Sequence, residues 1–264
     1  MTLGFATTSD GARLYYEIAG DGPPVVLVHG GLWDRRMWDQ QWEAFTERFR
    51  VMRFDARGFG RSDPLTGTFR DVDDVVAVTD ATGFDHSALV GLSFGGYVSI
   101  DVVLARPERV TALVLVGAGV RGFDEWRPEI DARQEEAEAL ARAGDLATAT
   151  DVYLDIFTPL RTGDDERQRR IAHENENAQS IENDELREAI EPRAIDRLGE
   201  IGVPKQVVWG DRDIEEIAAM GEILVAGIPG ARRAVIEDAD HVPNIRKPDL
   251  FNRVVLEFLE EALR

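Results

Sequence analysis

The chain has 264 residues, of which 44% are hydrophobic, and this size and composition suit one α/β domain with an insertion. Its formal net charge of −20 repels phosphate backbones, which argues against nucleic acid as a partner. The chain has no cysteine and no apolar run of about 18 residues, so we expect no disulfide, no thiolate site and no membrane span.

Strand and helix patterns alternate along most of the chain, which is typical of a mostly parallel sheet with helices on both faces. The first two strands form an antiparallel hairpin turned at residues 9–11. We therefore predict an eight-stranded, mostly parallel sheet. The expected strands are residues 4–8, 14–19, 25–28, 51–54, 88–90, 111–116, 205–209 and 232–236. The expected helices around this sheet are residues 37–49, 72–82, 97–104 and 249–263.

Between residues 119 and 201 the chain becomes highly charged and shows helical patterns without any strand pattern. Open α/β sheets bind their ligands at the carboxyl edge of the strands. We therefore expect residues 120–200 to form a helical cap over that edge, and residues 1–119 and 201–264 to form the core. The expected cap helices are residues 125–143, 146–157, 166–177 and 184–198.

The most informative motif is Gly91-Leu92-Ser93-Phe94-Gly95, between the buried strand at 88–90 and the helix at 97–104. A G-x-S-x-G on a strand-to-helix turn holds its serine in a strained, exposed position. The glycines flank it because a side chain there would collide with the neighbouring strand and helix. This arrangement predicts that Ser93 is a nucleophile.

A serine hydroxyl needs a base to remove its proton, and the chain has four histidines. His29 follows a strand and is expected to brace a loop. His86 is expected to be exposed, and His173 lies in the cap. His241 follows the last strand on a loop long enough to reach the carboxyl edge of the sheet, so we predict that it is the base.

The base needs a carboxylate to fix its tautomer, and two aspartates compete for this role after the strand at 205–209. Asp211 directly follows the turn glycine and is expected to cap that turn. Asp213 lies two residues further out, where its side chain can reach the loop of His241. We favour Asp213, and the order serine, aspartate, histidine agrees with that of strand-elbow hydrolases.

Attack by a serine on a carbonyl carbon produces a tetrahedral oxyanion, and this oxyanion needs backbone N–H donors that already point at it. Phe94 supplies one N–H at the start of its helix, where the helix dipole adds favourable potential. The loop of residues 29–32 follows the central strand and is expected to supply the second donor from Gly31.

These motifs resemble the α/β-hydrolase superfamily over essentially the whole chain. The resemblance rests on the His29-Gly30 loop, the turn at residues 55–62, the elbow at Ser93, the G-x-x-D run at 210–213 and His241. It implies the α/β-hydrolase fold and, because the family's acid is the last residue of the G-x-x-D run, it implies Asp213. The chain looks closest to small bacterial enol-lactonase-like, esterase-like and cofactor-free haloperoxidase-like enzymes. One departure is Asp240, where the family usually has glycine, and this carboxylate either alters the basicity of His241 or faces water.

A serine at position 93 implies an acyl-enzyme, whereas members of this fold with an aspartate at the elbow form an alkyl-enzyme ester. We therefore expect a hydrolase of a small-molecule ester or lactone that needs no cofactor. Three alternatives stay open: a perhydrolase or haloperoxidase, a C–C bond hydrolase, and a small-ligand receptor without turnover.

The substrate pocket is expected to contain apolar residues near the oxyanion site and residues of the cap. Arg121 is placed to bind a substrate carboxylate. No histidine–carboxylate cluster has the spacing of a metal site. The absence of a leader sequence favours the cytoplasm, and the sequence leaves open whether the chain forms a homodimer. The expected pocket residues are Leu32, Trp33, Arg121, Trp126 and Phe157.

Overall fold

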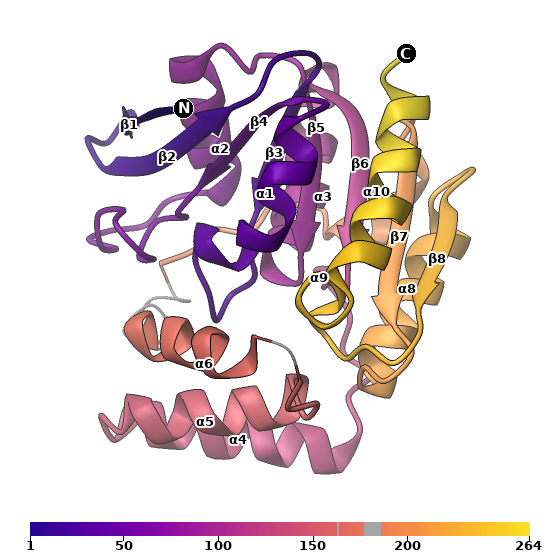
Figure 1. The fold of residues 1–264 in the computed structure, drawn as a ribbon. Helices are drawn as coiled ribbons and strands as arrows, with labels where there is room; N and C mark the ends of the chain where they lie inside the picture. Colours follow the sequence, from indigo (N-terminus) through magenta and orange to yellow (C-terminus); the bar gives the residue numbers. More distant parts are fainter. Residues whose placement is uncertain (163, 177–185) are drawn as a thin grey trace.

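The computed structural model describes residues 1–162, 164–176 and 186–264. Its centre is an eight-stranded sheet in the order β1-β2-β4-β3-β5-β6-β7-β8 (Figure 1). β2 pairs antiparallel with β1 and β4, and all other neighbours are parallel, so the predicted sheet is confirmed. The strands are β1 (Thr2–Thr7), β2 (Arg13–Ala19), β3 (Pro24–Val28), β4 (Arg50–Phe54), β5 (Ser87–Leu92), β6 (Val110–Val116), β7 (Lys205–Gly210) and β8 (Arg232–Ile236).

Burial along the strands follows their place in the sheet. Every residue of the central strand β5 is buried, whereas the edge strand β1 is mostly exposed. A parallel strand with helices on both faces has no solvent-facing side, which explains the continuous apolar runs that identified β3 and β6 in the sequence.

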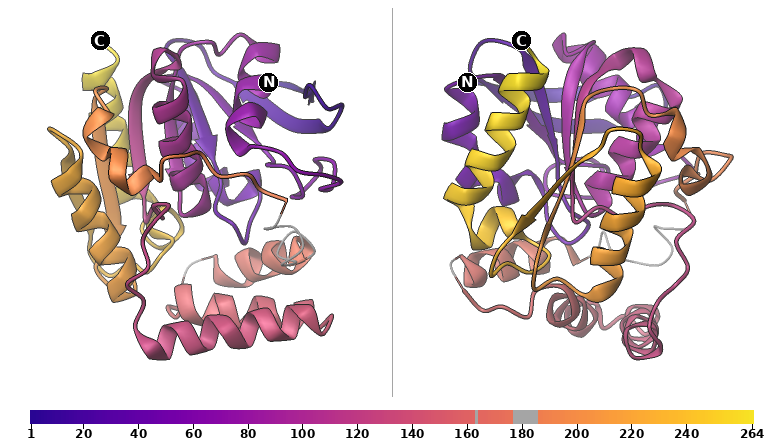
Figure 2. Two further views of the ribbon diagram at one scale, coloured as in Figure 1. Left: turned by 180° about the vertical axis from the view of Figure 1, so that it is seen from behind. Right: turned by 90° about the vertical axis from the view of Figure 1, so that its right-hand side faces the viewer.

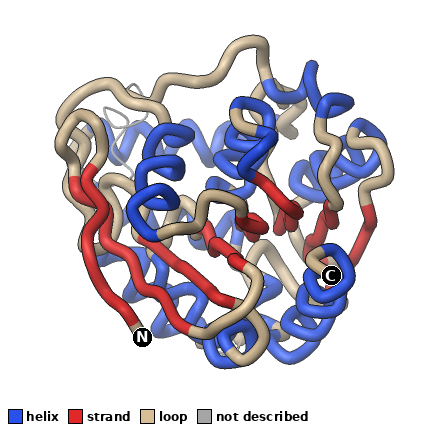
Figure 3. The backbone as a smooth tube through the Cα atoms, turned by 90° about the horizontal axis from the view of Figure 1, so that it is seen from above, coloured by secondary structure: helices blue, strands red, loops and turns tan. Residues whose placement is uncertain are grey.

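Helices cover both faces of the sheet (Figure 3). One face packs against α2, α3 and α8, and the other against α1, α9 and α10. α10 illustrates the pattern, because Phe251, Val255, Phe258 and Leu259 form a buried stripe along it. The helices around the sheet are η1 (Arg35–Trp38), α1 (Asp39–Thr46), α2 (Asp71–Thr82), α3 (Phe94–Ala105), η2 (Pro107–Arg109), η4 (Ala194–Glu200), α8 (Glu215–Gly227), α9 (Pro243–Arg246) and α10 (Pro248–Ala262).

Three further helices, α4 (Pro128–Arg142), α5 (Leu146–Phe157) and α6 (Asp165–Glu174), form a group at one end of the sheet (Figures 1 and 2). α4 and α5 lie side by side as a hairpin, and Asp145 caps α5 by accepting a hydrogen bond from the Thr148 N–H. Trp33, in the loop after β3, donates its indole N–H to the Gln168 carbonyl of α6 at 3.2 Å. The group therefore lies over the carboxyl ends of the parallel strands.

The predicted helix at 184–198 is wrong over the part that the structure describes. Residues 186–193 are not helical, and Ala194–Glu200 forms a 3₁₀ helix. Two causes are visible: Pro192 has no N–H to donate within a helix, and the backbone around Arg187 instead pairs with Phe69 in a β-bridge.

Other helix predictions differ mainly at their ends. The helix expected at 37–49 is split into η1 and α1, and the one expected at 125–143 begins only at Pro128. The helix expected at 166–177 spans Asp165–Glu174, and its predicted last residue lies outside the described residues. Helix α8 was not predicted, although Ile217, Met220 and Leu224 recur on one face with helical spacing.

Candidate active site

Ser93 is the single residue between β5, which ends at Leu92, and α3, which begins at Phe94. Its φ of +54° and ψ of −112° make it one of two residues other than glycine with a positive φ in the described chain. An L-residue in this region is strained, and such strain persists only where the surroundings enforce it. Here the Ser93 N–H donates to the Val116 carbonyl of β6, while the N–H groups of Gly96 and Tyr97 donate to the Ser93 carbonyl.

The glycines around Ser93 are required by close backbone packing. A Cβ at Gly91 would overlap the Gly95 carbonyl, and one at Gly95 would overlap the carbonyl oxygens of Val28 and His29 on the neighbouring strand. The turn can therefore approach β3 only with glycine at these positions.

His241 and Asp213 are in direct contact, with 3.0 Å between Nδ1 of the histidine and Oδ2 of the aspartate. Both side chains are almost fully buried. The other Asp213 oxygen, Oδ1, accepts the Ile214 N–H at 2.9 Å. Burial raises the pKa of Asp213, while the charge and hydrogen bond of His241 oppose that shift. The alternative acid, Asp211, is exposed and accepts the Ala239 N–H, so the structure brings Asp213 and not Asp211 to the histidine.

The three other histidines lie elsewhere. His29 is fully buried; its Nε2 accepts the Ala56 N–H at 2.9 Å, so Nδ1 carries the proton that is shared with the Gly30 carbonyl. Burial lowers its pKa, which favours the neutral ring. His86 is exposed as expected, and His173 contacts Asp151 on the α5 side of α6.

Gly31 and Phe94 face each other beside Ser93. A Cβ built on Gly31 would lie 3.4 Å from the Cβ of Phe94, an ordinary van der Waals contact. Phe94 is the first residue of α3, and the first N–H groups of a helix have no partner within the helix. The two segments predicted to supply oxyanion donors are therefore neighbours.

Asp240 does not face water, contrary to one of the two alternatives considered from the sequence. Its side chain is fully buried, and it accepts hydrogen bonds from Arg246 Nε at 2.9 Å and from the Leu160 N–H at 3.0 Å. Arg246 also donates to the Thr162 carbonyl at 2.8 Å and lies 3.2 Å from Asp165. The residue before His241 thus anchors the segment between α5 and α6 to the core.

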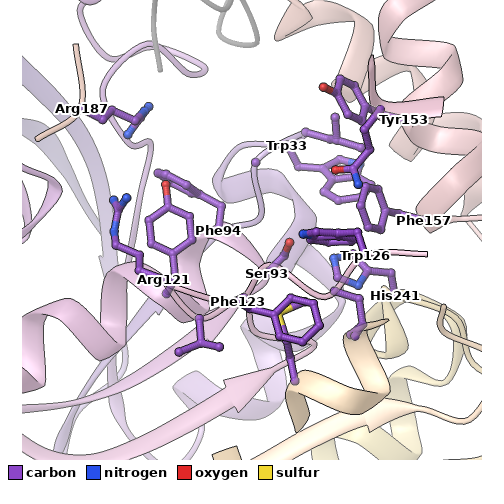
Figure 4. A pocket seen from close by; sticks show the side chains of 18 of the residues that line it. Trp33, Ser93, Phe94, Arg121, Phe123, Trp126, Tyr153, Phe157, Arg187 and His241 are labelled. Atoms are coloured by element: carbon purple, nitrogen blue, oxygen red, sulfur yellow. The ribbon is translucent and has the colours of Figure 1, made fainter. Parts of the chain in front are cut away.

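A cavity of about 400 Å³ opens above Ser93, between the elbow and residues of the α4–α5 hairpin (Figure 4). Its wall contains Ser93, His241, Gly31 and Phe94, together with every pocket residue expected from the sequence. The Phe157 ring lies 5.0 Å from the His241 ring, and the Phe157 carbonyl accepts the His241 N–H. The position of these residues is thereby fixed, whereas their contacts with substrate stay predictions.

Sequence reasoning missed several residues of this wall. Tyr97 could have been found, because it lies one helical turn after Ser93 on the same helix. The other missed residues reach the cavity through tertiary contacts, which no local sequence pattern predicts. The missed residues include Phe59, Tyr97, Gln134, Tyr153, Arg187 and Met220.

Among residues 1–162, 164–176 and 186–264, no group of three or more acidic or histidine side chains is arranged to hold a metal ion. None of the helices in the same residues combines the length and apolarity that a membrane crossing requires.

Comparison with known proteins gives a consistent result. A family model described as the alpha/beta hydrolase fold matches residues 23–248. The structure of a thermophilic esterase from Thermogutta terrifontis superimposes with a TM-score of 0.85 at 26% identity, over 100% of both chains. The enol-lactonase from Burkholderia xenovorans gives a TM-score of 0.81 at 25% identity, over 97% of this chain and 100% of the other. A 2-hydroxy-6-oxononadienedioate/2-hydroxy-6-oxononatrienedioate hydrolase from Paraburkholderia xenovorans is 28% identical over 94% of this chain and 90% of its own length.

Proposed function

Because the chain belongs to the alpha/beta-hydrolase fold family, we propose that it is a serine hydrolase that cleaves a carboxylic ester or lactone of a small molecule. In this proposal Ser93 is the nucleophile, His241 the base and Asp213 the acid. Residues 1–119 and 201–264 form the catalytic core, and residues 120–200 form the cap that selects the substrate.

The proposed reaction has two stages, acylation of Ser93 and hydrolysis of the acyl-enzyme. His241 Nε2 removes the proton from Ser93 Oγ as that oxygen attacks the carbonyl carbon, and the carbonyl electron pair moves onto its oxygen. The N–H groups of Phe94 and Gly31 hold the oxyanion. Its collapse breaks the C–O bond, and the imidazolium protonates the departing alcohol. Water then repeats the sequence on the acyl-enzyme, which releases the acid and restores Ser93.

The observation that supports this proposal most strongly is the contact between Nδ1 of His241 and Asp213. A carboxylate at Nδ1 keeps the proton there and leaves Nε2 to act as base, and its charge stabilises the imidazolium that forms. The strained turn at Ser93 opens onto the same cavity as His241, so nucleophile and base share one site.

The similar proteins support the same class of reaction. Two of them are named for hydrolysis of an ester and an enol-lactone, which are both attacked at an acyl carbon. The apolar cavity wall, which includes Leu32, Trp33, Trp126 and Phe157, suits the hydrocarbon part of such a substrate.

The test is a panel of short-chain esters, aryl esters and lactones with the wild type and with Ser93→Ala. We expect multiple turnover by the wild type and loss of at least about 10³-fold in the variant, with unchanged circular dichroism. Undiminished hydrolysis by Ser93→Ala would contradict the assignment. Stoichiometric labelling by a fluorophosphonate without turnover of any panel member would instead indicate a ligand receptor.

A further inference from the structure

The cavity above Ser93 has two chemically different ends (Figure 4). His241, Phe157, Tyr153 and Trp33 lie on one side of Ser93. On the other side lie two arginines, Arg121 and Arg187, and both belong to the cavity wall. Charged side chains rarely line an otherwise apolar cavity, so this second end calls for a chemical explanation.

Arg121 is held in place by two aspartates and an aromatic ring. Its Nε donates to Asp101 Oδ2 at 2.7 Å, its Nη2 lies 3.8 Å from Asp71, and its guanidinium carbon lies 4.4 Å from the centre of the Tyr97 ring. The side chain is 23% exposed. A guanidinium has five N–H donors, and these contacts engage only part of them.

Arg187 lies at the same end of the cavity, but only 5% of its side chain is exposed, and its Nη2 donates to the Arg57 carbonyl at 3.4 Å. It forms an ion pair with Asp71, the aspartate that Arg121 also approaches, and its guanidinium carbon lies 4.7 Å from the centre of the Phe94 ring. Phe94 and Tyr97 pack edge to face with 5.0 Å between their centres. The two arginines are therefore stacked over adjacent rings, next to the first turn of the nucleophile's helix.

The aspartates stabilise this pair without blocking it. Both are buried, and neither is among the described residues of the cavity wall, so they lie on the protein side of the arginines. The ion pairs and ring contacts fix the guanidinium groups before any ligand arrives, which lowers the entropic cost of binding.

We propose that the arginine end of the cavity binds a free carboxylate of the substrate, with Arg121 as its hydrogen-bond donor. This inference rests on the proposed ester hydrolysis at Ser93, and it defines the substrate class as an ester or lactone of a dicarboxylic acid with one acid group left free. Guanidinium is suited to this ligand because its planar fork matches the two oxygens of a carboxylate. The carboxylate occupies the arginine end while the scissile carbonyl lies at Ser93.

The test compares monoethyl esters of succinate, glutarate and adipate with matched neutral esters in which an isopropyl group replaces the carboxylate. Ethanol release gives kcat/KM for each. We expect the wild type to prefer the best acidic ester over its neutral partner about tenfold or more, since hydrogen bonds between charged groups contribute at this scale. Arg121→Gln reduces that preference by about tenfold to hundredfold. Arg109→Gln removes the same charge outside the cavity and leaves the preference unchanged.

A second variant guards against misfolding, because Arg121→Gln leaves Asp101 buried without its partner. Arg121→Gln combined with Asp101→Asn removes both charges and is expected to lose the preference in the same way. Binding of free glutarate to Ser93→Ala by calorimetry provides a readout that does not need turnover, and adding Arg121→Gln is expected to weaken it.

The outcomes separate the two proposals. Equal or better hydrolysis of the neutral esters by the wild type overturns the carboxylate site while leaving ester hydrolysis intact. An acidic preference that survives Arg121→Gln also overturns it. If no ester is hydrolysed at all, the proposed function fails, and glutarate binding that depends on Arg121 still decides whether the carboxylate site exists.

Discussion

The elbow at Ser93 and the helix α6 both lie near the carboxyl ends of the strands, but different forces hold them in place. The elbow is fixed by backbone packing, since Gly91 and Gly95 leave no space for a single added carbon. α6 is fixed by polar contacts with the core: Asn175 donates to Asp34 at 3.0 Å and accepts the Gly60 N–H at 2.7 Å, and Trp33 donates to Gln168.

Because of this difference, the elbow and the contacts of α6 should respond differently to solution conditions and to mutation. Steric packing depends little on salt or pH, so we expect Ser93 to keep its geometry under most conditions. Polar contacts depend on protonation and can be removed one at a time. We expect changes at the elbow side to abolish catalysis or folding and changes at the cap junction to act in smaller steps.

The largest effect is expected on the catalytic side, from Asp213→Asn. An amide cannot stabilise the imidazolium of His241 and favours the wrong tautomer, so kcat falls by about 10⁴-fold. Asp211→Asn is the matched control at an exposed position, and its activity stays within about twofold of the wild type. Initial rates with one ester measure both, and the opposite ranking would show that the acid is misassigned.

Gly95→Ala tests whether packing alone fixes the elbow. Its Cβ would overlap backbone oxygens of Val28 and His29, so we expect a loss of more than about 4 kcal/mol in the free energy of unfolding. Gly202→Ala adds the same carbon where no atom lies within 4 Å and is expected to cost less than about 1 kcal/mol. Urea unfolding gives both values. Similar stabilities for the two variants would refute a steric origin.

Arg246→Met tests the polar junction beside His241. It leaves the Asp240 carboxylate buried without a charge partner, which is expected to destabilise the protein by about 3–5 kcal/mol. Adding Asp240→Asn removes that charge and recovers part of the loss. The pair is measured by chemical unfolding, and wild-type stability of Arg246→Met alone would mean that the junction is not held by this ion pair.

The smallest effect concerns pH and Asp34, which links α6 to the core. Burial acts to raise its pKa, but hydrogen bonds from Arg36 and Asn175 prevail and lower it to about 2. A lowered pKa stabilises the folded state above the unfolded value near 4, and this stabilisation is lost as the pH falls from about 4 to 2. The contribution is about 2 kcal/mol. We expect the stability difference between the wild type and Asp34→Asn to shrink over that range in urea titrations, and a constant difference would contradict it.

The same contrast explains what the sequence revealed. The G-x-S-x-G elbow, the G-x-x-D run and the histidine after the last strand are local patterns, so Ser93, Asp213 and His241 could be proposed as site residues from the sequence. The hairpin pattern of the first two strands and the strand patterns that follow predicted all eight strands for a similar reason. Helix α8 was missed although its periodicity was present in the sequence.

The cap junction had no such signal. Asp240 and Leu160 are 80 residues apart, and Asn175 and Asp34 are 141 residues apart, so nothing local connects them. Arg187 reaches the cavity because its segment pairs with Phe69 instead of forming the predicted helix. Contacts between distant segments decide these positions, and a single sequence does not encode them in any short pattern.

The α4–α5 hairpin has a consequence for how this enzyme could diversify. It supplies Gln134, Tyr153 and Phe157 to the cavity, while α6 carries most of the polar contacts with the core described above. A recombination or a designed library that exchanges the hairpin between Arg127 and Phe157 would replace much of the cavity wall and keep Ser93, Asp213, His241 and the contacts of α6. Such a division lets new substrate ranges arise by exchanging one segment, without re-evolving the machinery that breaks the bond.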